Sequence, residues 1–143
     1  MPNYPKMKKL IIILTITLLS CNGQQAKHKE LKEIATELNS LCPLMVDQGT
    51  RFDKVLCTSD NLLDLTFTLV NLVKDSTDTK GLENELKIFL SDHLKNGFTI
   101  NQNINIDIEF LKQRRVTFHY TYLDKNGQSL TNIFIKPTDY FTK

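Results

Sequence analysis

A short polar cluster holds the residues with the clearest chemical potential: Asp47, Thr50, Arg51 and Asp53. The fork of an arginine donates paired hydrogen bonds to a carboxylate or phosphate, so Arg51 is a candidate anion clamp. The competing interpretation is structural: Asp47 closes a loop, while Arg51 and Asp53 project from the solvent face of a strand. Apolar and polar residues alternate from Thr50 to Thr58, which favours the structural interpretation.

Cys42 and Cys57 form the next candidate pair. In an oxidising compartment they could form a disulfide, and closing a loop of about 16 residues would contribute about 3 kcal/mol. The alternative is two reduced thiols that pack as small apolar groups. We expect Cys42 at a helix end and Cys57 at the far end of the next strand, a separation near ~20 Å that a disulfide cannot span.

The three histidines, His28, His93 and His119, are too scattered for a metal or triad signature. The sequence also has no Cys-x-x-Cys, no Gly-x-Ser-x-Gly and no glycine-rich phosphate loop. It therefore predicts no catalytic residue, no metal ligand and no cofactor. The chain could still be an enzyme if residues that are distant in the sequence form an active site.

The charge distribution argues against a nucleic-acid partner. Three of the 18 basic residues and none of the 16 acidic ones precede Cys21, so the rest of the chain is close to neutral. Binding to phosphates needs clustered lysines and arginines that displace counterions. The one adjacent arginine pair, Arg114 and Arg115, is interpreted as a solvated start of a strand.

The spacing of apolar residues predicts the helices and strands that carry these side chains. A helix beginning near Lys27 presents an apolar stripe made of Leu31, Ile34, Ala35, Leu38 and Leu41. Pro43 ends this helix, because the residue before a proline is pushed out of the helical region. Two strands at 50–58 and 62–73 then form a hairpin around a Ser-Asp-Asn turn.

A second amphipathic helix follows the hairpin, with an apolar stripe made of Leu82, Leu86, Phe89, Leu90 and Leu94. A short helix is expected around 105–112. Strands at 116–122 and 130–136 form a final hairpin, because Asn126-Gly127 readily adopts the positive φ of a tight turn. The order α-β-β-α-(α)-β-β predicts an α+β fold with a four-stranded antiparallel sheet and helices packed on one face.

The N-terminal segment has the pattern of an export signal. Lys8 and Lys9 precede an apolar run from Leu10 to Leu19, about half the ~20 residues of a membrane-spanning helix. The string Leu18-Leu19-Ser20-Cys21 then resembles the lipobox of bacterial lipoproteins. That resemblance implies cleavage before Cys21 and acylation of this residue, as by palmitate. Two or three acyl chains hold a protein durably on a bilayer.

The domain boundaries follow from this signal: a signal peptide at 1–20, a polar tether at 21–27 and a single α+β domain at 28–143. Asn22 follows the lipidated position. An aspartate there favours inner-membrane retention in enterobacteria, so Asn22 points to the outer membrane.

Residues 42–53, Cys-Pro-Leu-Met-Val-Asp-Gln-Gly-Thr-Arg-Phe-Asp, resemble a group of small exported bacterial proteins with a Pro-x-x-Val-Asp-x-x-Thr-Arg-x-Asp segment. The resemblance extends to the aromatic strand at 120–122 and to Pro137-Thr138-Asp139. It implies export and a shared fold, and it transfers no catalytic residues.

Taken together, the sequence predicts a lipid-anchored protein of the bacterial cell envelope. Its domain is expected to be a non-enzymatic binding or assembly module with an envelope protein as partner. Two alternatives are a tethered hydrolase that acts on an envelope polymer and an inhibitor or immunity-type lipoprotein.

Overall fold

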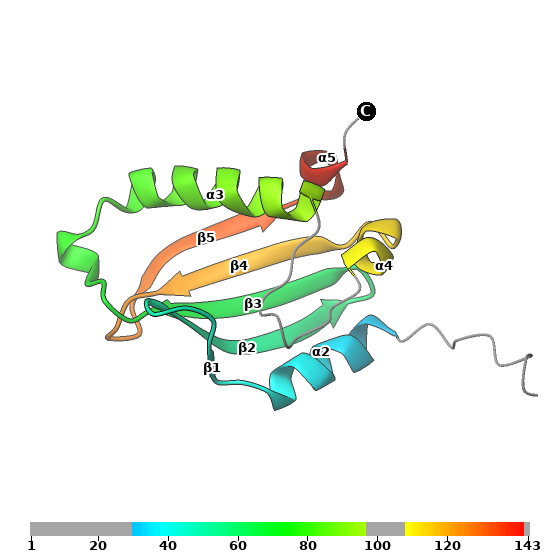
Figure 1. Ribbon diagram of the computed structural model, residues 1–143, viewed down its shortest axis with the longest axis horizontal. Coiled ribbons are helices and arrows are strands. Elements are labelled where there is room, and N and C mark those ends of the chain that lie inside the picture. Colours follow the sequence, from blue (N-terminus) through cyan, green and yellow to red (C-terminus); the bar gives the residue numbers. More distant parts are fainter. Residues whose placement is uncertain (1–29, 97–107, 142–143) are drawn as a thin grey trace, which may run out of the picture.

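Figure 1 shows the computed structural model of the protein, which describes residues 30–96 and 108–141. The predicted signal peptide, Cys21 and the tether at 21–27 lie outside these residues, as does His28. The described part is an α+β domain with one five-stranded sheet in the order β1-β2-β3-β4-β5. The strands are β1 (Leu44–Met45), β2 (Thr50–Ser59), β3 (Leu62–Leu69), β4 (Thr117–Leu123) and β5 (Ser129–Ile135).

The prediction of an α+β fold is confirmed, but the prediction of a four-stranded antiparallel sheet was wrong in two respects. First, β1 adds a strand of two residues beside β2, too short to give a periodic signal. Second, β3 and β4 run parallel, so the sheet is mixed. The chain between them includes α3 (Thr79–Asn96) and α4 (Ile108–Gln113), which is long enough to return it to the end where β3 began.

The helices pack against one face of the sheet. Side chains from α2 (Leu31–Ser40), α3, α4 and α5 (Pro137–Tyr140) join the inward side chains of the strands in a single buried cluster. In Figure 1, α2 lies along β2 and α3 lies along β5, so the central strands β3 and β4 run between the two helices. The opposite face carries no helix among the described residues and is lined by partly exposed, mostly polar side chains.

The predicted stripe of α2 is largely confirmed. Leu31, Ala35 and Leu38 are buried against the sheet. Leu41 is 48% exposed, contrary to expectation, because the helix already ends at Ser40. The last turn also protects the sheet edge, since the backbone N–H of Val55 in β2 donates to the Asn39 side chain at 3.1 Å.

The turn between β4 and β5 is fixed by Asp124, whose side chain has no exposed surface. Its carboxylate accepts hydrogen bonds from the backbone N–H groups of Lys74 (3.0 Å), Asn126 (2.8 Å) and Gln128 (2.9 Å). Burial acts to raise the pKa of Asp124, but these hydrogen bonds outweigh it and hold the pKa below its ordinary value. Gly127 has a φ of +80°, as the Asn-Gly pattern predicts. Asp124 thus ties this hairpin to the 3-10 turn η2 (Lys74–Ser76).

Candidate binding groove

An apolar groove of about 640 Å³ lies between α3 and the central strands. Phe67 of β3 and Tyr120 and Tyr122 of β4 contribute to its floor. The rings of Phe67 and Tyr122 stack with their centres 5.4 Å apart. The helix α3 forms one wall, and the β1–β2 loop with the start of β2 forms the other. The groove therefore occupies the helix-bearing side of the sheet, where neither α2 nor α3 covers β3 and β4 fully.

The wall formed by α3 exposes apolar surface. Only Leu90 and Leu94 of this helix are buried, while Leu82 and Leu86 are half-buried and Phe89 is 50% exposed. The predicted amphipathic helix is therefore present, and Phe89 of its apolar stripe is exposed. The helix packs chiefly over the edge strand β5. One side of its stripe consequently faces the groove instead of the sheet.

Tyr120 and Tyr122 place two hydroxyl groups in the otherwise apolar floor of the groove. They are 3% and 5% exposed, and neither hydroxyl makes a hydrogen bond to the described residues. Burial raises the pKa of both tyrosines, and the negative charge of Asp47 raises that of Tyr122 further. Both hydroxyls therefore stay protonated. Thr131 Oγ1 is the fully buried side-chain oxygen without a partner among the described residues, so the two tyrosine hydroxyls keep accessible surface in the groove and can bond an occupant there.

The charged residues in the described lining are acidic. Asp47 and Glu85 belong to opposite walls, and the lining residues that the structure describes include no lysine or arginine. His93 lies beside them on α3, with its ring centre 3.8 Å from that of Phe89. An apolar floor with an acidic rim favours an occupant that carries both apolar and cationic groups.

The structure divides the polar cluster predicted from the sequence. Asp47 accepts a hydrogen bond from the Gly49 N–H at 2.7 Å, and it lines the groove together with Thr50. Arg51 and Asp53 lie on the opposite face of the sheet. The four residues do not form one site, because successive residues of a strand point to opposite faces.

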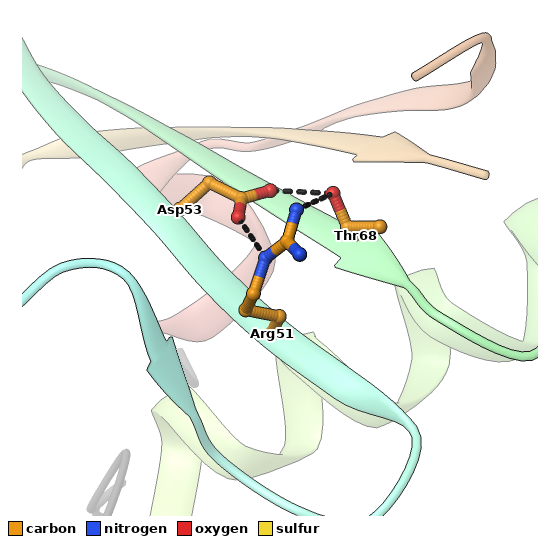
Figure 2. A network of polar contacts seen from close by, with 3 residues as sticks. All are labelled: Arg51, Asp53 and Thr68. Atoms are coloured by element: carbon orange, nitrogen blue, oxygen red, sulfur yellow. Dashed lines mark hydrogen bonds and ion pairs between the residues drawn. The ribbon is translucent and has the colours of Figure 1, made fainter. Parts of the chain in front are cut away.

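Figure 2 shows the contacts of Arg51 and Asp53 on the open face. Arg51 Nε donates to Asp53 Oδ1, and Thr68 Oγ1 donates to Asp53 Oδ2. Arg51 Nη2 lies 3.4 Å from Thr68 Oγ1. Part of the guanidinium fork is therefore already engaged across β2 and β3. Arg51 as an anion clamp remains a prediction.

The open face also contains a pair that the sequence could not reveal. His119 Nδ1 and Asp64 Oδ1 lie within hydrogen-bond distance, and Thr58 donates to the other carboxylate oxygen at 2.8 Å. The His119 ring stacks on Phe134 with centres 4.1 Å apart. Asp64 and His119 are 55 positions apart in the chain, and only the parallel register of β3 and β4 brings them together.

Cys42 and Cys57 are free thiols in the structure. Cys42 follows the C-terminal end of α2, whereas Cys57 shares a hollow with Glu30 and Leu31 at the other end of this helix. Ten helical residues span about 15 Å, and a disulfide needs α-carbons within about 7 Å. A bridge would therefore require the backbone to move. Burial, followed by the charge of Asp53, raises the pKa of the Cys42 thiol and keeps it protonated.

Two further properties concern the described residues as a whole. No group of three or more His, Cys, Asp or Glu side chains there could hold a metal ion. Within the same ranges, no helix is both long enough and apolar enough to cross a bilayer.

No protein-family model and no curated protein matches the sequence. Solved structures do match the fold. The pilotin EpsS of the Vibrio vulnificus type 2 secretion system aligns with a TM-score of 0.56 and 10% identity, over 78% of this chain and 89% of its own. The type II secretion pilotin AspS of Vibrio cholerae aligns with a TM-score of 0.53 and 12% identity, over 76% and 86%.

A candidate secreted protein of Pseudomonas aeruginosa also aligns, with a TM-score of 0.58 and 12% identity over 78% of this chain and 89% of its own. At these identities the comparisons establish that the chain shares the pilotin fold. They also support the α+β class reached from the secondary-structure pattern.

Proposed function

We propose that the chain is a lipid-anchored protein of the bacterial cell envelope whose non-enzymatic domain binds a segment of another envelope protein, in the manner of a secretion-system pilotin. The groove between α3 and the central strands is the observation that carries this proposal. It combines an exposed Phe89 with the accessible hydroxyls of two largely buried tyrosines, which make no hydrogen bond to the described residues. The likeness to EpsS and AspS supports it, because both are pilotins of type II secretion systems.

The chemistry of the groove defines the partner segment. Its apolar side chains would cover Leu82, Leu86 and Phe89, and its polar groups would accept hydrogen bonds from the tyrosine hydroxyls. Lysine or arginine at its flanks would face Asp47 and Glu85. Such charge complementarity contributes more to specificity and association rate than to affinity.

Acylation of Cys21 is the second part of the proposal. The lipobox-like string at 18–21 supports it, and Asn22 supports the outer membrane as the destination. Mass spectrometry of the mature N-terminus should find an acylated Cys21, and Cys21→Ala should release or misprocess the protein. An unmodified N-terminus at Met1 or Met7 would refute the anchor.

The groove is tested with two phenylalanines of equal exposure on opposite faces. Phe89 in the groove is 50% exposed and Phe134 on the open face is 49% exposed. Phe89→Asp should abolish co-isolation of the partner from crosslinked envelopes, because it places a charge in the apolar wall. Phe134→Asp should retain it. If the two substitutions have equal effects on the partner, the groove is not the binding site.

A further inference from the structure

One end of the molecule pairs arginines with aromatic rings. The Cζ atom of Arg114 lies 5.3 Å from the centre of the Phe110 ring, and that of Arg115 lies 5.5 Å from the centre of the Phe141 ring. Both arginines are exposed, and Phe141 is 40% exposed. Figure 1 places α4, α5 and the first turn of α2 at this same end of the sheet. We call the surface formed by Phe110, Arg114, Arg115 and Phe141 the tether end.

The backbone of Arg115 has an unusual conformation, with a φ of +55°. Its N–H donates to the carbonyl of Lys112 at 2.8 Å, and the Val116 N–H donates to the carbonyl of Leu111 at 3.2 Å. This pattern is the Schellman motif that ends many helices, and its left-handed position usually holds glycine. An L-residue is strained there because its Cβ crowds the following carbonyl. The fold thus keeps a long cationic side chain where glycine would fit with less strain.

The predicted anchor holds this end near a membrane. Nine peptide units separate Cys21 from Glu30, the residue just before α2, and they reach about 30 Å at full extension. Glu30 and Lys32 line one hollow together with Asp60 and Arg114. The charges that line this hollow are balanced, with Lys32 and Arg114 against Glu30 and Asp60, so the cationic character of this end comes from the two exposed arginines. Of the other exposed acids on these elements, Glu109 is paired with Lys112 and Glu33 accepts a hydrogen bond from the Glu30 N–H.

We propose that the tether end rests on an anionic phospholipid surface, with the two guanidinium groups on lipid phosphates and Phe141 in the headgroup layer. An aromatic ring beside a cation suits the membrane–water interface, because the ring can enter the headgroup layer while the charged group stays in contact with water and phosphate. Anionic lipids attract juxtamembrane basic residues within a Debye length. The inference rests on the proposed lipid anchor, and it would orient the domain on the membrane.

The absence of tryptophan from the chain makes a direct test practical. The mature acylated protein with Phe141→Trp is reconstituted in vesicles of brominated phosphatidylcholine, alone or with about a third phosphatidylglycerol. We expect a blue-shifted and strongly quenched emission in the anionic vesicles. Gln48→Trp, in the loop before β2 at the other end of the sheet, should remain unquenched.

Arg115→Gly is the matched variant, combined with the Phe141→Trp reporter. It removes the cation and relieves the strain, so its thermal midpoint should not fall, yet the docked fraction should drop by about 5-fold. Arg114→Gln should act in the same direction. Equal quenching in neutral and anionic vesicles, or quenching unchanged by Arg115→Gly, would overturn the proposal. Protein that fails to float with vesicles refutes the anchor and this inference, whereas floating protein with an unquenched Trp refutes the inference alone.

Discussion

Removal of the Tyr122 hydroxyl separates binding from stability more sharply than any other substitution in the groove. Tyr122 is 5% exposed, and its hydroxyl makes no hydrogen bond to the described residues. Tyr122→Phe therefore removes a hydroxyl that faces the groove without leaving a partner unsatisfied, and stability should change by less than about 0.5 kcal/mol. In the complex the same change removes one hydrogen bond, worth about 1 kcal/mol, so partner affinity should fall about 5-fold.

Tyr140 provides the control with the opposite behaviour. It is 2% exposed, and its hydroxyl donates to the backbone carbonyl of Val116 at 2.6 Å. Burial raises the pKa of Tyr140 to about 12, against the smaller opposing effect of Arg115, so the hydroxyl remains a donor. Tyr140→Phe leaves a buried carbonyl unsatisfied and should cost about 1–3 kcal/mol, with partner affinity unchanged.

Urea unfolding followed by far-ultraviolet circular dichroism measures the stability of both variants, and titration with the partner segment measures affinity. With a slope of about 1–1.5 kcal/mol/M for a domain of this size, Tyr140→Phe should lower the midpoint by roughly 1–3 M. The midpoint of Tyr122→Phe should stay within experimental scatter. If Tyr122→Phe is as destabilising as Tyr140→Phe, its hydroxyl is already paired in the unbound protein, and the reasoning fails.

Three further predictions follow from the packing and from the electrostatics. Leu94→Ala on the buried side of α3 should cost about 2–5 kcal/mol, while Phe89→Ala on the groove side should stay within about 0.5 kcal/mol; thermal denaturation distinguishes them. The pKa of Asp124 is lower folded than unfolded, so its contribution to stability is complete above its unfolded pKa of about 4 and is lost as the pH falls through the folded pKa. Melting temperatures between about pH 5 and 2.5 should therefore fall more for the wild type than for Asp124→Asn. Arg115→Gly should raise stability by about 1 kcal/mol in the same melts, and a loss of stability would mean that the Phe141 contact outweighs the strain.

Local patterns in the sequence predicted most of the elements correctly, because these patterns have local causes. The turn at Asn126-Gly127 requires a positive φ, and this fixed the second hairpin. Alternation in the strands separated the buried face from the polar face, including Arg51 and Asp53 on the polar side. Local patterns do not determine the order and direction of the strands in the sheet. The parallel pairing of β3 with β4 depends on where the intervening helices return the chain.

The groove escaped prediction for a related reason. Phe89 and Tyr122 have the spacing of ordinary core residues, and the position of α3 over β5 leaves them lining the groove. Arg115 was missed because it occupies a left-handed position where the sequence rules expect glycine.

The groove beside α3 is proposed to hold a segment of an envelope protein. The most direct measurement places a photoreactive amino acid at Leu86, in the groove, or at Thr66, on the open face, in the native envelope. We expect the photoreactive group at Leu86 to form an adduct with one peptide. This peptide should have apolar residues flanked by lysine or arginine, and Tyr122→Phe should weaken the adduct. Equal adducts from both positions, or none from Leu86 while Thr66 reacts, would contradict the proposal.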